Sequence, residues 1–189
     1  DELTKLISET NAQVQKLEQR KNELSSQLNA LKDTADKNEK AAEIAKQNAQ
    51  TNGILSGRLA ATGEGVVIRI SQGSKQKIDS AILFTLLEEL RNSGAEVIEI
   101  NNVRVVTSTY ISGTAGSLVC DGTKLKSPFT IRAIGDSDNL QNAVNLAGGV
   151  GSRLKVKYGA TVSVSPSDKV MIKSTRQAPQ YTYAHVIGQ

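Results

Sequence analysis

The stretch from Asp79 to Val106 constrains the fold most, because it predicts a helix, a tight turn and a strand in immediate succession. Asp79 and Ser80 are residue types that cap helix N-termini. The apolar residues that recur on one helical face are Ile82, Leu83, Leu86, Leu87 and Leu90. Gly94 then ends the helix, and the β-forming residues after it are Val97, Ile98, Ile100, Val103, Val105 and Val106. A helix that runs so directly into a strand packs back onto a sheet, so we expect the other strands around this pair.

The first 62 residues are organised differently, because their apolar side chains recur in heptads. The seam positions that carry the pattern are Leu3, Ile7, Val14, Leu17, Leu24, Leu28 and Leu31. A seam with β-branched residues at one position and Leu at the other favours a parallel two-stranded coil, and Lys21 within it disfavours higher oligomers. We therefore expect residues 1–52 to form the helix of a parallel coiled-coil dimer. An antiparallel hairpin within one chain and a detached helix are the alternatives.

Glycines at positions 53, 57 and 63 end the heptads and predict a linker over residues 53–64. After it, short β-branched runs alternate with turn residues. We expect residues 107–110 to extend the organising strand, further strands at 65–70, 117–120, 123–126, 129–134, 161–164 and 169–172, and helices at 138–147 and 150–158. Asp121 and Gly122 predict a hairpin turn, and Pro166 lies at the centre of a second expected hairpin. Residues 150–158 also fit a strand. Within the C-terminal tail of residues 176–189, residues 180–186 either pair as an edge strand or stay loose.

This order of elements predicts an α+β protein in which the long helix precedes a ferredoxin-like sandwich over residues 65–175. Its sheet would be mostly antiparallel and would carry two helices on one face.

Composition excludes several classes of function. The net charge of +4 lies entirely beyond residue 62, and aromatic residues make up only 3% of the chain, which argues against nucleic acid as a partner. Cys120 is the lone cysteine and His185 the lone histidine, so one chain holds neither a disulfide nor a Cys/His zinc site. A Ser–His–Asp triad could use only His185, which lies in the tail. We therefore expect no enzymatic activity, no metal and no cofactor.

Several short motifs carry a resemblance to a known family. They are Gly65-Val66-Val67, Leu86 to Leu90, Gly94 to Ile98, Ile100 to Val105, Pro128, Ala133 to Asp136, Gly148-Gly149 and Tyr181 to Ala184. On these residues the chain resembles, over about positions 63–183, the YlxW/YlxX-like bacterial family of unknown function, number 881 in the domain-of-unknown-function series.

The resemblance implies a place in the cell rather than a reaction. Members look like single-pass membrane proteins of Gram-positive bacteria, with a coiled coil and this domain outside the membrane and with genes near those of cell division and wall synthesis. No run of about 18 apolar residues occurs here, so we expect the membrane helix to lie in a segment that precedes Asp1. The expectation is a non-enzymatic envelope scaffold at the extracytoplasmic face, dimerised by its coil, that binds other envelope or division proteins.

The polar residues of the central strand suggest an alternative function. Arg104 could hold an anionic ligand that Asn101 orients, with Arg132 lining the same pocket, as in a small-ligand or carbohydrate-binding sensor. The competing interpretation is structural: Asn101 fixes a turn, and Arg104 pairs with Glu96 or Glu99.

Other candidate groups also have structural explanations. Asp136 is a possible ligand or partner contact, yet its position is first that of a helix N-cap. Gly148 and Gly149 could cradle a phosphate but lack the spacing of a dinucleotide site. The basic residues of 153–157 could meet an anionic polymer or lipid headgroups, although a solvated helix face explains them too.

Overall fold

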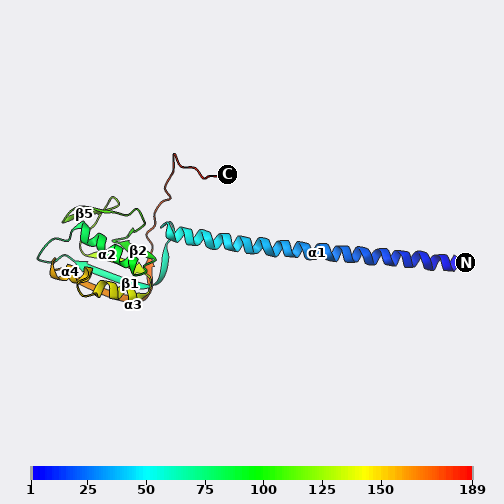
Figure 1. Ribbon diagram of the computed structural model, residues 1–189, viewed down its shortest axis with the longest axis horizontal. Coiled ribbons are helices and arrows are strands. Elements are labelled where there is room, and N and C mark those ends of the chain that lie inside the picture. Colours follow the sequence, from blue (N-terminus) through cyan, green and yellow to red (C-terminus); the bar gives the residue numbers. More distant parts are fainter. Residues whose placement is uncertain (1, 189) are drawn as a thin grey trace. The chain divides into compact units, whose positions relative to one another are not determined.

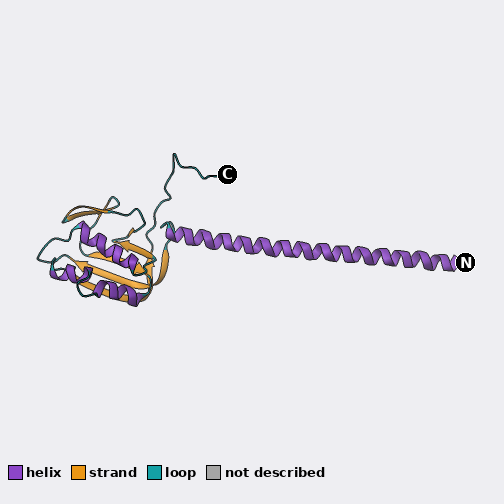
Figure 2. Cartoon of the chain, viewed as in Figure 1, coloured by secondary structure: helices purple, strands orange, loops and turns teal. Residues whose placement is uncertain are grey.

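The computed structural model describes residues 2–188 and is an α+β protein with a long N-terminal helix, antiparallel sheets and further helices (Figure 1). The chain divides into two compact units, one up to Ala49 and one from Gln50 onward. Figure 2 shows the helices in purple and the strands in orange.

Helix α1 (Glu2–Leu55) is confirmed as the first element. Every described side chain in it up to residue 52 is exposed, and the seven seam residues are 48–71% accessible. Their pairing with a second helix stays a prediction. The helix also continues through Gly53, so the expected linker over 53–64 was too long. Gly53 is buried beneath Leu59, whose Cδ1 would lie 2.5 Å from an added Cβ, and the glycine therefore serves close packing rather than flexibility.

The main sheet has five strands in the order β3-β2-β7-β1-β8, and every pairing in it is antiparallel. The strands are β1 (Ala61–Ser71), β2 (Val97–Ile100), β3 (Val103–Arg104), β7 (Phe129–Ile134) and β8 (Thr161–Ile172). The helices are α2 (Ser80–Asn92), α3 (Ser137–Asn145) and α4 (Val150–Val156). The helix expected over residues 150–158 forms as α4, so three helices, rather than two on one face, contribute to the apolar core with the sheet.

The organising helix and strand form as expected. The five apolar residues of α2 are all at most 4% exposed and pack against alternate residues of β1, β2 and β7, such as Ile68, Ile98 and Ile131. Asp79 caps α2, since its Oδ1 accepts from the Ile82 amide at 2.9 Å. Gly94 follows with φ at +93°, the left-handed conformation in which glycine is favoured.

A second sheet has three strands in the order β4-β5-β6, and its strand β4 contacts helix α2. Its strands are β4 (Ile111–Thr114), β5 (Ser117–Cys120) and β6 (Thr123–Lys124). The hairpin turn at Asp121 and Gly122 is confirmed, with both residues at positive φ. Strand β4 was not expected; residues 107–110, expected to extend the organising strand, are a turn and loop instead.

Two expectations about strands were wrong. The segment after Ile98 is a hairpin, not one continuing strand, because Asn101 and Asn102 both take positive φ and reverse the chain between β2 and β3. Residues 161–172 form one strand, not a hairpin around Pro166. Strand β8 lies at the sheet edge, where a residue without an N–H is tolerated, and Pro166 simply faces Val66 of β1. Residues 180–186 of the tail form no strand.

Candidate functional site

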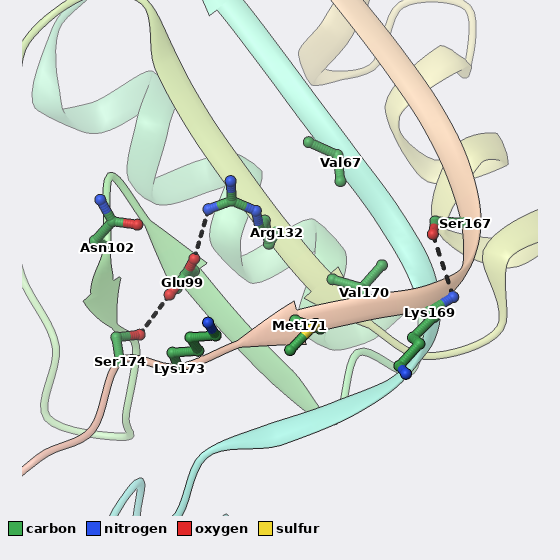
Figure 3. A pocket seen from close by; sticks show the side chains of 10 residues that line it. All are labelled: Val67, Glu99, Asn102, Arg132, Ser167, Lys169, Val170, Met171, Lys173 and Ser174. Atoms are coloured by element: carbon green, nitrogen blue, oxygen red, sulfur yellow. Dashed lines mark hydrogen bonds and ion pairs between the residues drawn. The ribbon is translucent and has the colours of Figure 1, made fainter.

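The face of the main sheet opposite its helices carries a hollow of about 590 Å³. Because side chains alternate across a strand, the neighbours of the buried core residues Ile68, Ile98 and Ile131 point to this other face. The residues that line the hollow are Val67, Glu99, Asn102, Arg132, Ser167, Lys169, Val170, Met171, Lys173 and Ser174 (Figure 3).

Glu99 is the polar anchor of the hollow. Its side chain is 3% exposed, its Oε1 accepts from Nη1 of Arg132 at 2.8 Å, and its Oε2 accepts from the Ser174 hydroxyl at 2.5 Å. Figure 3 shows these two contacts converging on the carboxylate from β7 and from the segment after β8. A buried carboxylate requires such partners, so Glu99 positions Arg132 and Ser174 while its own charge is compensated.

Three cationic side chains also line the hollow. Arg132 remains 33% exposed and uses Nη1 for Glu99. Lys169 lies near the end of β8 and Lys173 just beyond it; both are exposed, and within residues 2–188 neither ammonium lies within ion-pair distance of a carboxylate. The hollow thus carries three cationic side chains and a single carboxylate. This surplus of positive charge suits an anionic ligand.

Arg104 is not part of the hollow. It is 2% exposed, and its guanidinium donates to three backbone carbonyls, those of Ile54 (3.0 Å), Leu59 (2.8 Å) and Ser174 (3.0 Å). Burial lowers the pKa of Arg104, while its cross-strand neighbour Glu99 opposes that shift. The guanidinium therefore ties the last turn of α1 and the C-terminal segment to β3, and it pairs with neither Glu96 nor Glu99 as an ion pair.

Arg176 also fixes the C-terminal segment to the domain. Its Nε donates to the Arg104 carbonyl at 2.8 Å, its amide donates to the Gly57 carbonyl at 2.7 Å, and its Nη2 forms an ion pair with Asp121. The expected tail of residues 176–189 therefore begins with a residue that is fixed to the domain.

Asn101 serves the turn, as the structural interpretation held. Its Oδ1 accepts from the Thr130 amide at 2.8 Å and its Nδ2 donates to the Lys126 carbonyl at 2.9 Å. Its neighbour Asn102, not Asn101, lines the hollow.

Asp136 lies at the start of α3, away from these residues. Its Oδ1 accepts from the Asn139 amide at 2.9 Å, which is the bond of an N-cap. Burial, followed by the neighbouring Asp121 carboxylate, raises the pKa of the Cys120 thiol to about 11, so a nucleophilic thiolate is disfavoured at neutral pH. Among residues 2–188 no cluster of His, Cys, Asp and Glu is arranged to hold a metal ion.

Of the four expected contact residues, Arg132 lines the hollow. The other lining residues were not selected from the sequence. Those missed are Glu99 as a positioning group, Asn102, Ser167, Lys169, Lys173 and Ser174. The alternation of Lys169, Met171 and Lys173 was visible in the sequence. What it could not show is that the end of β8, which pairs with β1, and the segment after it line one hollow with residues of β2 and β7.

Comparison with known proteins gives the family. A family model described as "Bacterial protein of unknown function (DUF881)" matches residues 48–185. This chain belongs to that family. The resemblance to YlxW and YlxX is confirmed, since Bacillus subtilis YlxW is 30% identical over 62% of this chain and 54% of its own length, and YlxX is 31% identical over 69% and 63%.

Mycobacterial proteins are also similar to this chain. A UPF0749 protein of Mycobacterium bovis is 34% identical over 87% of this chain and 57% of its own length. The crystal structure of an uncharacterized conserved protein from Mycobacterium tuberculosis matches with a TM-score of 0.67 and 35% identity, over 74% of this chain and 99% of that one. The chain spans little more than half the length of the curated relatives it matches. No helix among the described residues combines the length and apolarity that crossing a membrane requires.

Proposed function

We propose that this DUF881 member is a non-enzymatic scaffold of the bacterial cell envelope, dimerised by a parallel coiled coil over residues 1–52. The observation that carries the proposal is the exposure of all seven seam side chains on α1. An exposed helix owes most of its stability to packing of an apolar stripe, and within its own unit this stripe has nothing to pack against. A second copy of the same helix would cover it.

The seam supports a copy of the chain as the covering partner. Leu17, Leu24 and Leu31 occupy one seam position, while Ile7 and Val14 occupy the other, a combination that suits a parallel pair. Acidic and basic residues balance over residues 1–62, so two identical helices would not repel each other. Dimerisation would present two C-terminal domains to envelope or division proteins.

The proposed domain is ferredoxin-like over residues 65–175. Support comes from the order of β2-β7-β1-β8, with helices connecting β1 to β2 and β7 to β8. The extracytoplasmic location, the single-pass anchor and the link to cell division or wall synthesis rest on the family resemblance. The non-enzymatic role rests on side chains with structural duties, since Asp136 caps a helix and Arg104 binds carbonyls.

Sedimentation equilibrium of residues 1–189 tests the dimer. We expect a mass of two chains. The double variant Leu17→Asp, Leu24→Asp places four carboxylates in the seam of each dimer and should give monomers. The matched control is Gln19→Asp, Ser26→Asp, which adds the same charge at positions that face away from the seam. A wild-type chain that stays monomeric at high concentration, or a control that dissociates equally, would refute the coil.

A further inference from the structure

We propose that the hollow on the helix-free face binds a small ligand bearing a phosphate monoester, held between Arg132 and Lys173. This site goes beyond the scaffold proposal, because it lies in the domain and needs no second chain. The hollow of about 590 Å³ falls within the range of about 300–1,000 Å³ typical of small-molecule sites.

The charge of the lining selects the ligand. Arg132, Lys169 and Lys173 line the hollow with a single carboxylate, Glu99, and the Lys169 side chain extends away from Arg132 (Figure 3). A phosphate monoester carries about −1.5 to −2 at neutral pH and three acceptor oxygens, so it can contact Arg132 and Lys173 together, whereas a carboxylate offers one charge and two oxygens. A metal cation would meet an excess of side chains with its own positive sign.

The hydrogen bonds within the site leave donors available. Glu99 holds the Nη1 edge of Arg132, and among residues 2–188 no group accepts from the Nε or Nη2 of that guanidinium. A fixed, half-exposed guanidinium is suited to bind phosphate through paired N–H groups. Because both oxygens of Glu99 already accept bonds, from Arg132 and Ser174, its repulsion of an anion is reduced.

The other lining residues suit a ligand in which the phosphate is attached to a hydroxylated group such as a sugar. Lys169 and Lys173 are four positions apart, which at about 3.3 Å per residue of extended chain separates their Cα atoms by about 13 Å. A single phosphate therefore lies at the Lys173 end. Toward Lys169, the Ser167 hydroxyl accepts from the Lys169 amide at 3.2 Å and can donate its own proton to a ligand. Val67, Val170 and Met171 give the apolar surface on which a sugar ring packs.

Titration of the full ¹⁵N-labelled chain with glucose 1-phosphate, inorganic phosphate and glucose tests the site. We expect saturable amide shifts for Asn102, Ser167 and Ser174 with glucose 1-phosphate, weaker shifts of the same amides with inorganic phosphate, and none with glucose. Lys173→Gln should weaken binding about tenfold, because it removes one charge-assisted contact. Lys169→Gln should weaken it less.

The matched control is Lys155→Gln on α4, an exposed lysine outside the hollow with the same change of charge. It should leave the dissociation constant unchanged, and all three variants should keep the wild-type urea midpoint. The proposal is overturned if neither phosphate compound gives saturable shifts, or if glucose binds as tightly as its phosphate. Equal weakening by Lys155→Gln would also overturn it, because general attraction to a basic domain would then explain the binding.

Discussion

Replacement of Arg104 by methionine tests whether the guanidinium holds the domain together. Arg104 is 2% exposed and donates to the carbonyls of Ile54, Leu59 and Ser174 at 2.8–3.0 Å. These three carbonyls come from the last turn of α1, from the segment before β1 and from the segment after β8. Methionine has a comparable length and fills the space, but it offers no donor to any of them.

The expected loss follows from the bonds that disappear. A hydrogen bond from a charged donor contributes about 1.5–3 kcal/mol, so three such bonds give an upper limit near 4.5–9 kcal/mol. Two terms reduce this figure. Methionine needs no desolvation of a charge, and carbonyls at the edge of the site regain contact with water. We therefore expect Arg104→Met to lower the free energy of unfolding by about 3–5 kcal/mol, the range observed when one partner of a buried charged network is removed.

Urea unfolding followed by tyrosine fluorescence isolates the domain, because all four tyrosines lie beyond residue 109 and the chain has no tryptophan. The control is Arg69→Met on β1, an exposed arginine whose loss should change the free energy of unfolding by no more than about 0.5 kcal/mol. The loss of unfolding free energy for Arg104→Lys should lie between those of Arg104→Met and Arg69→Met, because an ammonium cannot reproduce the planar set of N–H donors of a guanidinium. If Arg104→Met costs no more than Arg69→Met, the three contacts do not stabilise the domain and the reasoning fails.

Three further outcomes are expected. Burial and the bond to Asp79 raise the folded-state pKa of Tyr158 from 10.0 to about 12. The protonated phenol therefore stabilises the fold at pH values below 10, and this contribution is lost as pH rises from 10 to about 12. Urea unfolding followed by circular dichroism should show a smaller alkaline loss of stability for Tyr158→Phe than for the wild type. Lys21→Ile should lower the dissociation constant of the dimer, because a lysine in the seam costs stability. Sedimentation equilibrium would show an unchanged dissociation constant if Lys21 lay outside the seam. Leu17→Cys should form an interchain disulfide on oxidation whereas the outward Ser26→Cys should not, and non-reducing electrophoresis would contradict a parallel coil if only Ser26→Cys cross-linked.

Local chemistry made much of the fold predictable from the sequence. Asp79 and Asp136 were expected as N-caps, and each accepts the amide three residues ahead. Gly94 was expected to end α2, and its φ of +93° explains why. These features depend on residues within one or two turns of each other, so the sequence alone contains the information that decides them.

The long-range pairings were less accessible. Pro166 interrupts a β-forming run and therefore predicted a hairpin, but its effect depends on whether β8 is an inner or an edge strand. That position is decided by β1, about a hundred residues earlier in the chain. Lys169 and Lys173 line the hollow with Arg132 and Glu99, so expecting a hairpin at Pro166 in place of one long strand concealed the hollow as well.

The two arginines of the central strands show why a polar residue type does not by itself identify a site. Arg104 and Arg132 were both plausible ligand contacts, and each is the direct cross-strand partner of Glu99, Arg104 from β3 and Arg132 from β7. Arg104 meets the free carbonyls of a helix end and two connecting segments, which occupy its donors. Among residues 2–188, the guanidinium of Arg132 donates to the carboxylate of Glu99 and to no other group, so part of it stays exposed. The distinction between a structural and a binding arginine is therefore set by which backbone acceptors the fold brings near it, and those of Arg104 come from residues up to 70 positions away.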